Sequence, residues 1–483
     1  MSVISLLFRR DHGVVFMDAA IFGILGLILI MIPSTILFVF QTIMYHSKKR
    51  YRVPIPAKNL KIGCVSIIIP IRKEPFELLD DALKYLSRLG INKEVIIVSD
   101  DPRDRLEQIR SIVEKWKKKG LNIVLIWRSE ARGFRTGALN VGLYASRGKY
   151  VYVMDIDSRI DEEFLVDAAK LIEEGKADAV VARWAPKNSD SRVAEAIAYS
   201  MKFVVDTIYK GRAGRGLPVF PLGTGTLYKA DMLKNELKGW DEKRIQDDME
   251  IGSRMMKLGK KILYHDKYKV LVEVPRRYRS LRIQQERWAY GALDVAIARF
   301  KDIITSPYPL LARLDSLVFL LQYTPAVLGI IGVIILGLSC IMYPMDYIGA
   351  YWYIGIPWII SAAVYAYSYI DSLREIDNDL WHIMVNLGRS SATTVSLTPT
   401  FTYASFKALL RRPFIYKRTP KGKHESKTHG YRIPWELIIG ISSALFGLYL
   451  CLTGILYTGL WFITYSSGYL YSCYRWFEDI IKR

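Results

Sequence analysis

The 483-residue chain is longer than a single hydrophobic core usually supports, so at least two structural units are expected. Hydrophobic residues make up 51% of it and charged residues 24%, a mixture typical of a chain that is part soluble domain and part membrane protein. A net charge of +21 could indicate a nucleic-acid partner, but much of the basic excess flanks apolar stretches, so no nucleic-acid binding is predicted.

The first apolar run predicts a membrane helix within residues 1–50. Ala19–Ile43 is long enough to cross a bilayer, which takes about 20 residues. No clear small-residue cleavage site follows this run, so we expect the helix to be retained. The basic cluster at 48–52 then lies on the cytosolic side by the positive-inside rule, and the amino terminus lies outside.

From Cys64 onward, short β-branched runs alternate with helix-like segments. The strand-like runs are Cys64–Ile71, Glu94–Asp101, Asn122–Arg128 and Tyr150–Asp157, and the helix-like segments are Leu78–Leu89, Leu106–Lys119, Gly137–Ser146 and Glu162–Glu173. This alternation predicts an α/β domain over residues 60–300, with a largely parallel sheet covered on both faces. Ligands of such sheets bind beyond the carboxyl ends of the strands, and two of these strands end in acidic residues.

Residues 301–483 are expected to hold the other membrane segments. The apolar spans are Leu317–Met342, Ile348–Tyr369, Trp435–Leu456 and Gly459–Tyr474. Leu380–Leu410 is apolar but interrupted by Arg389, hydroxyl residues and Pro399, so we interpret it as interfacial or re-entrant rather than as a spanning hairpin. Five spans place the basic loop near 411–432 and the carboxyl terminus on the cytosolic side, close to anionic membrane lipids.

Two acidic clusters follow strand-like runs. Asp155 and Asp157 close one run, and strand alternation would turn both carboxylates to the same face, where they could bind a hard divalent cation. Asp100 and Asp101 close an earlier run and could bind a nucleobase or ribose. Either cluster could instead only cap a turn or helix, although Asp161 could supply the cap after Asp157.

Two further clusters lie in helix-like segments. Gln246–Asp248 begins one of them, where the helix dipole favours acidic residues and where Asp248 could act as a general base on an acceptor hydroxyl. Gln284, Arg287 and Trp288 share one face of another helix. The arginine could bind a diphosphate and the tryptophan a sugar ring, unless the tryptophan only anchors the helix at a membrane surface.

Taken in order, these clusters resemble the family 2 glycosyltransferases of the cellulose synthase and hyaluronan synthase branch, whose pattern is D, DxD, an ED-type triplet and QxxRW. The stretches VSIIIPIRKEP, RGFRTGALNVGL and GTGTLYKAD are also similar to that branch. The resemblance covers about Val65 to Asp294. It departs at Arg135, where the family usually has lysine, and at Gln246-Asp247-Asp248, where it usually has Thr-Glu-Asp.

The resemblance implies a GT-A fold, transfer with inversion and a need for Mg²⁺ or Mn²⁺. By similarity Asp157 and Asp155 hold the metal, and Asp248 is the catalytic base with Asp247 beside it. By the same resemblance the donor is expected to be a UDP-sugar, which would contact Pro70, Arg72, Glu74, Asp100, Asp101, Arg135, Asp155 and Arg287. The acceptor is expected to contact Gly223, Thr224, Gly225, Gln284 and Trp288.

The resemblance also implies a processive polysaccharide synthase that exports its product, in the plasma membrane with a cytosolic catalytic domain. A single transfer to a lipid acceptor, such as a polyprenyl phosphate or glycolipid, is the alternative. A non-catalytic scaffold would predict losses among the acidic clusters, and the sequence has none. Residues 414–421 are similar to the loop that covers the nucleotide in cellulose-synthase-like enzymes, or they form a basic lipid-binding loop.

Overall fold

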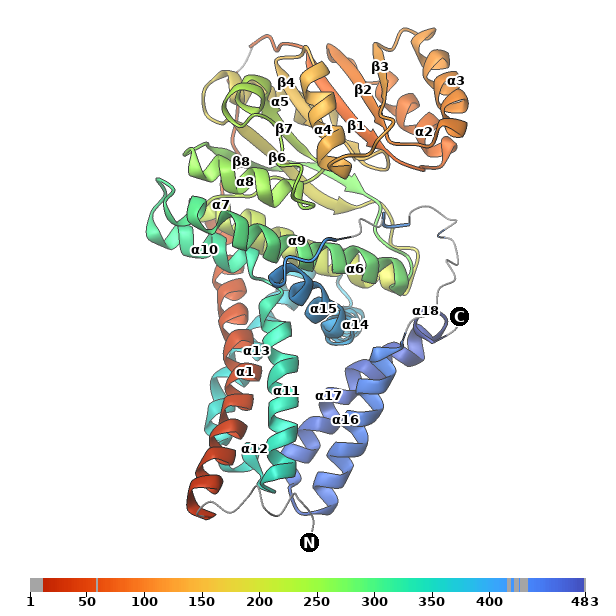
Figure 1. The fold of residues 1–483 in the computed structure, drawn as a ribbon. Coiled ribbons are helices and arrows are strands. Elements are labelled where there is room, and N and C mark those ends of the chain that lie inside the picture. Colours follow the sequence, from red (N-terminus) through yellow and green to blue (C-terminus); the bar gives the residue numbers. More distant parts are fainter. Residues whose placement is uncertain (1–11, 58–59, 415–417, 421–424, 426–432, 482–483) are drawn as a thin grey trace.

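The computed structural model describes residues 12–57, 60–414, 418–420, 425 and 433–481. An α/β domain forms one end of an elongated molecule, and long helices extend away from it toward the other end (Figure 1). A layer of helices lies between the two parts (Figure 1), namely α6 (Arg192–Val204), α9 (Tyr278–Ile304), α10 (Leu310–Leu320), α14 (Leu380–Ser396) and α15 (Thr398–Leu409).

Eight strands form one mixed sheet in the order β3-β2-β1-β4-β7-β6-β8-β5. The strands are β1 (Val65–Ile71), β2 (Lys93–Ser99), β3 (Ile123–Trp127), β4 (Tyr150–Val153), β5 (Arg159–Ile160), β6 (Ala179–Pro186), β7 (Thr226–Lys229) and β8 (Ile262–Val272). Strands β1 to β4 are parallel to one another, and so are β6 and β8. Strand β7 runs antiparallel to β4 and β6, and β5 runs antiparallel to β8.

The prediction of a largely parallel sheet is therefore wrong for β5 and β7. A strand that is parallel to its neighbour needs a crossover, which returns the chain to the end of the sheet where the neighbouring strand begins. After β6 the chain instead enters α6, the π-helical segment η4 (Val205–Gly211) and the short α7 (Arg212–Gly214), which lie between the sheet and the long helices (Figure 1). The chain therefore enters β7 from the end of the sheet at which β4 and β6 finish, so β7 runs antiparallel to both.

Both faces of the sheet are covered, as the sequence predicts. Alternation along β1 directs Ile67 and Ile69 into one buried cluster and Ile68 into another. The covering helices are α2 (Phe76–Ser87), α3 (Leu106–Lys117), α4 (Phe134–Ala145), α5 (Glu162–Glu173) and α8 (Asp247–Lys257). Helix α4 begins three residues before the predicted start, because Gly133, with a φ of +70°, turns the chain into it.

Four helices of the described chain are long and apolar enough to cross a membrane. They are α1 (His12–Ser47), α11 (Thr324–Met342), α13 (Trp352–Leu373) and α16 (Trp435–Leu452). The predicted span Leu317–Met342 is interrupted, because α10 ends at Leu320 and α11 begins at Thr324 with a proline in its first turn. The span predicted at Ile348–Tyr369 likewise divides into α12 (Tyr347–Ala350) and α13.

The fifth predicted span, Gly459–Tyr474, lies within α17 (Leu456–Arg475), which forms a hairpin with α16 (Figure 1) but is not among the four. Leu380–Leu410 forms α14 and α15, which are also not among them. Helix α14 packs against α6 and α17, and α15 packs against α9 and α11. Both helices therefore lie between the α/β domain and the long helices, and the interfacial interpretation of the segment stays a prediction.

The carboxyl-terminal hairpin and α18 (Phe477–Ile480) return to the start of α9. The ring of Tyr278 stacks on that of Trp476, with 5.1 Å between centroids, and the fully buried Tyr278 hydroxyl lies 2.9 Å from that of Ser396. Arg277 forms a 2.8 Å ion pair with Asp479. The first turn of α9 is therefore held by residues about 200 positions further along the chain.

Candidate active site

One cavity of about 1380 Å³ joins the α/β domain to the membrane helices. It is lined by every predicted site residue except Asp101 and Gly225. Away from the sheet it is lined by residues of α1, α11, α13, α14 and α17, including Ile30, Gly329, Trp358, Thr393 and Tyr465. Residues that are far apart in the sequence therefore share one space at the junction of the two parts.

Asp155 and Asp157 lie in the loop after β4, which already ends at Val153. The prediction that strand alternation aligns them is therefore wrong, although both line the cavity. Thr224 holds this loop: its hydroxyl accepts a hydrogen bond from the Asp155 backbone nitrogen at 3.2 Å and lies 2.8 Å from the hydroxyl of Ser158. The loop before β7, which carries Gly223 and Thr224, is thus directly connected to the DxD loop of Asp155 and Asp157.

Asp161 stands at the N-cap of α5, but it makes no side-chain cap hydrogen bond. Its carboxylate instead accepts a hydrogen bond from the backbone nitrogen of Lys269 in β8 at 3.2 Å. The predicted cap is therefore wrong, because this side chain turns toward the neighbouring strand.

The DxD loop suits a metal that is bound together with its substrate. Mg²⁺ and similar ions are often held by one or two carboxylates, with phosphate and water oxygens completing the shell. Asp155 and Asp157 supply two carboxylates at the cavity, and Asp157 is only 1% exposed. Within the described ranges, His, Cys, Asp and Glu side chains form no group of three or more that could hold a metal.

Arg135 connects three parts of the site. It is the second residue of α4, and its Nη2 donates to Asp155 at 2.9 Å and to the carbonyl oxygen of Gly223 at 2.6 Å. Its Nη1 forms an ion pair with Asp247. The planar guanidinium, with five donors, makes these contacts to the DxD loop, the loop before β7 and α8 at once.

Asp248 is held by three donors at the first turn of α8. Its Oδ1 accepts hydrogen bonds from the Gln246 side chain at 2.9 Å and the Met249 backbone nitrogen at 2.7 Å, and its Oδ2 accepts one from the Gly223 nitrogen at 3.2 Å. Burial and repulsion by the adjacent Asp247 raise the pKa of Asp248 to about 6. A carboxylate with that pKa is ionised at neutral pH and basic enough to accept a proton.

Asp100 and Asp101, the two aspartates after β2, have different partners. Asp100 lines the cavity and accepts hydrogen bonds from Arg128 Nε at 2.6 Å and Nη2 at 2.5 Å. Asp101 is 3% exposed and bonds the backbone nitrogen of Lys73 at 2.8 Å and the guanidinium of Arg105 at 2.9 Å. Asp101 thus holds the loop after β1 in place and lies outside the cavity, contrary to its predicted contact with the nucleotide.

Gly225 is needed for the backbone rather than for a ligand. Its φ is +101°, and a Cβ there would lie 2.6 Å from the Val270 side chain. It does not line the cavity, whereas Gly223 and Thr224 do, and the acceptor contact of those two residues stays a prediction.

Helix α9 presents Gln284, Arg287 and Trp288 to the cavity, as their spacing predicts. The Trp288 ring lies 5.9 Å from that of Trp184 on β6, centroid to centroid. Sequence reasoning missed Trp184, which also lines the cavity. It stands near the end of an apolar strand, and no local pattern distinguishes it from a residue of the core.

Part of the predicted basic loop near 411–432 reaches the cavity. Arg418, Thr419 and Pro420 line the cavity, and Arg418 forms an ion pair with Glu74 in the loop after β1. The rest of the predicted covering loop, residues 415–417 and 421, lies outside the described residues, as does the carboxyl-terminal pair 482–483.

Comparisons with known proteins agree with this geometry. The family described as Glycosyl transferase family group 2 matches residues 150–368. A probable glycosyltransferase of Sulfolobus acidocaldarius is 32% identical over 478 residues, which cover 94% of this chain and 98% of that protein. Glucomannan 4-beta-mannosyltransferase 1 of Oryza sativa subsp. japonica is 27% identical over 271 residues, which cover 53% of this chain and 52% of that protein.

A solved structure shows the same fold. The mannosyltransferase PcManGT from Pyrobaculum calidifontis, in complex with GDP-Man and Mn²⁺, superposes with a TM-score of 0.51 and 16% identity. The match covers 82% of this chain and 100% of that one. The similarity inferred from the DxD and QxxRW patterns is thereby confirmed. This chain belongs to the family 2 glycosyltransferases, and it joins a GT-A domain to helices apolar enough to cross a membrane.

Proposed function

We propose that this enzyme transfers a hexosyl group, with inversion, from a nucleotide diphosphate sugar to a growing polysaccharide and passes the product toward the membrane. The observation that carries the proposal is the cavity of about 1380 Å³, which runs from Pro70 and Asp100 past Asp248 to the membrane helices. Lys48–Arg50 at the end of α1 support a cytosolic position for the α/β domain at the plasma membrane.

The donor would bind on the sheet side of the cavity. In this arrangement the nucleoside lies near Pro70, Arg72 and Asp100, and the diphosphate faces Asp155 and Asp157, which would hold Mg²⁺ or Mn²⁺. The bound metal would neutralise the negative charge that develops on the departing diphosphate. Arg287, which lines the same cavity, would add a bidentate contact to it.

Asp248 would act as the base. Its three donors hold the carboxylate at the cavity surface, where it would take the proton of an acceptor hydroxyl as that oxygen attacks the anomeric carbon. The hydroxyl oxygen forms the new glycosidic bond, and the bond from the anomeric carbon to the diphosphate oxygen breaks. Its pKa of about 6 leaves Asp248 mostly ionised at neutral pH.

The lining beyond Asp248 favours a glycan acceptor. Trp288 and Trp184 offer aromatic faces beside the base. Further along, α17 contributes Thr464, Tyr465, Ser467 and Tyr471, whose hydroxyl groups can hydrogen-bond sugars. These polar side chains also help explain why α17 is not among the four most apolar helices. The rice relative is named a mannosyltransferase, and PcManGT was solved with GDP-Man, so GDP-mannose is the first donor to test alongside the UDP-sugars.

A lipid acceptor is the second candidate. The same cavity is lined on the α1 side by Ile30, Leu37 and Phe38, an apolar surface that suits a hydrocarbon chain. In that case the enzyme would make a single transfer to a polyprenyl phosphate or glycolipid.

The test uses the full-length protein in nanodiscs with Mg²⁺ or Mn²⁺. GDP-mannose, UDP-glucose and UDP-N-acetylglucosamine are each offered with a β-linked mannooligosaccharide or a polyprenyl phosphate, and nucleotide release and product size are measured. Metal-dependent release with long products is expected, at a rate lowered about 10²–10⁴-fold in Asp248→Asn. Asp104→Asn, at an exposed carboxylate outside the cavity, is the matched control and should match wild type.

The size of the product distinguishes the two acceptors. A single sugar on the lipid would replace the polysaccharide proposal by the lipid one. Turnover of no donor, or an Asp248→Asn variant as active as wild type, would contradict both.

A further inference from the structure

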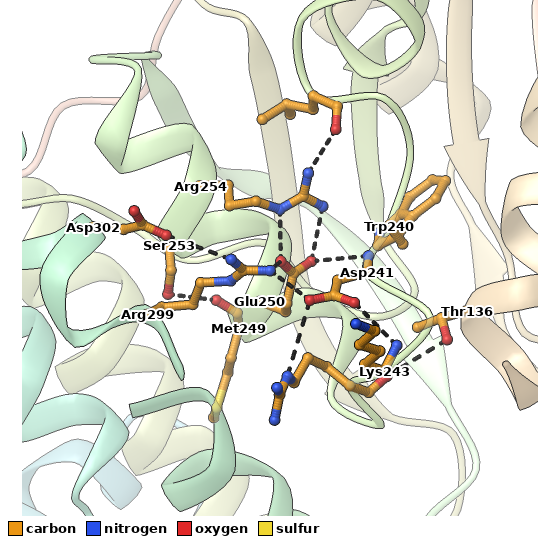
Figure 2. Close-up of polar contacts among 12 residues, drawn as sticks. Thr136, Trp240, Asp241, Lys243, Met249, Glu250, Ser253, Arg254, Arg299 and Asp302 are labelled. Carbon is orange, nitrogen blue, oxygen red and sulfur yellow. Dashed lines mark hydrogen bonds and ion pairs between the residues drawn. The ribbon is translucent and has the colours of Figure 1, made fainter. Parts of the chain in front are cut away.

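Glu250, two residues after Asp248 in α8, is the centre of a buried ionic network (Figure 2). Its side chain is only 1% exposed. Arg254 bonds both of its oxygens, Nε to Oε1 at 2.6 Å and Nη2 to Oε2 at 2.9 Å. Arg299 forms a second ion pair with Oε1 at 2.7 Å. A single buried carboxylate therefore binds two guanidinium groups.

The two arginines attach Glu250 to the segment that leads into α8 (Figure 2). Arg254 donates to backbone carbonyls of the turn Leu237–Gly239, at 2.6 and 2.7 Å. Arg299 pairs with Asp241 at 2.6 Å, and the Asp241 backbone nitrogen donates to Glu250 at 3.4 Å. Glu250, the fourth residue of α8, thus fixes the start of the helix, where Asp248 lies.

Arg299 also belongs to α9, the helix that presents Arg287 and Trp288 to the cavity. A second ion pair, between Arg244 and Asp294, joins the same segment to α9. Because α9 is continuous from Tyr278 to Ile304, Trp288 and Arg299 are held about 17 Å apart along its axis. The network therefore sets the position of the start of α8 relative to the cavity-facing part of α9.

The two helices also approach closely beside the base. A Cβ at Gly291 of α9 would lie 2.7 Å from the Cβ of Gln246, the residue whose side chain donates to Asp248. This contact leaves little room for α8 to shift without moving the donor that orients Asp248.

We propose that Glu250 and Arg299 are positioning residues. They fix the position of the Asp248 carboxylate relative to Trp288, so that the base deprotonates the acceptor hydroxyl rather than water. Neither residue lines the cavity, so both act through α8 and α9 and not by contact with substrate. The inference rests on the proposed role of Asp248 as base. A shift of the base harms attack by a bulky, fixed acceptor more than attack by water, which is small and mobile.

The test compares two rates in the full-length protein in nanodiscs: sugar transfer to the acceptor and hydrolysis of the donor by water. The donor and the acceptor are the pair that the wild type uses fastest in the panel above. We expect Glu250→Gln and Arg299→Lys to lower the ratio of transfer to hydrolysis about tenfold or more. Partial unfolding would reduce both rates equally and leave the ratio unchanged.

Glu94→Gln is the matched control. Glu94 is a buried carboxylate on β2 that accepts hydrogen bonds from Ser66 at 2.5 Å and Gly148 at 3.1 Å, and it lies outside the cavity. Its loss should lower stability without changing the ratio. Hydrogen exchange supplies a readout that needs no turnover: residues 246–250 should exchange faster in Glu250→Gln, whereas β1 and β2 should not.

Equal losses of transfer and hydrolysis in Glu250→Gln and Arg299→Lys, or unchanged exchange at 246–250, would overturn the inference. If Asp248→Asn abolishes transfer while those two variants keep the wild-type ratio, only the positioning role fails. If Asp248→Asn keeps full transfer, the assignment of Asp248 as the base is wrong, whatever the other two variants show.

Discussion

Arg135 lies 2.9 Å from the carboxylate of Asp155, and its other terminal nitrogen contacts Asp247. Lysine is usual at this position in the family, but a single ammonium group does not reproduce the fork that also reaches the Gly223 carbonyl. We expect Arg135→Lys to lose at least one contact, worth about 1–2 kcal/mol, and to raise the KM for the donor about 5–30-fold. Initial rates of nucleotide release measure this change, and an unaltered KM in Arg135→Lys would show that charge alone is sufficient.

The adjacent carboxylates predict how the rate depends on pH. Asp248 must be deprotonated to act as a base, and burial together with repulsion by Asp247 raises its pKa to about 6. The kcat should therefore fall as the pH drops through about 6 and level off above it. In Asp247→Asn the repulsion is gone, so the same fall should occur at lower pH. A profile that stays in place in Asp247→Asn would contradict the coupling of the two groups.

Thr224 should affect the metal more than the acceptor. Its hydroxyl bonds the Asp155 backbone nitrogen and the Ser158 side chain, so it fixes the DxD loop. Thr224→Val removes these contacts, and we expect the Mn²⁺ concentration for half-maximal activity to rise about 3–10-fold, with the acceptor KM unchanged. Thr224→Ser keeps the hydroxyl and should behave as wild type. A rise in acceptor KM alone would instead support the direct contact of Thr224 with the acceptor that the sequence predicts.

Trp184 should affect only the acceptor. Its ring lies 5.9 Å from that of Trp288, centroid to centroid, and both residues line the cavity. Aromatic contacts of this kind are worth about 0.5–1.5 kcal/mol, so Trp184→Ala should raise the acceptor KM about 2–12-fold and leave donor hydrolysis unchanged. Trp184→Phe keeps an aromatic face and should lose less. Equal effects on transfer and hydrolysis would indicate a role in folding instead.

Local sequence patterns predicted helices and strands well where the pattern within one segment determines its secondary structure. The helix-like segment at Glu162–Glu173 coincides with α5, and the apolar run that opens at Cys64 becomes β1. They did not predict the direction of β7, which depends on the path of the chain through α6 and α7 on the membrane side. Strand direction in such cases is a property of the whole topology.

The candidate site shows a similar division. The order of the motifs identified the residues around the cavity, including Asp248 and Trp288, because chemistry restricts residue type at these positions. The sequence could not separate Asp100, which faces the cavity, from Asp101, which holds a loop. Nor could it reveal Trp184, because its role depends on the pairing of β6 with the rest of the sheet.

The stacking of Tyr278 on Trp476 bears on whether the α/β domain and α9 can keep their structure without the carboxyl-terminal helices. A fragment that ends near residue 300 would retain every acidic motif but leave Tyr278 without its aromatic partner and Arg277 without Asp479. The first turn of α9 would then fray, and Gln284 lies less than two turns beyond Tyr278. A water-soluble enzyme cannot be obtained from this chain simply by cutting away everything after residue 300, because the end of α17 and α18 supply the partners that hold the first turn of α9.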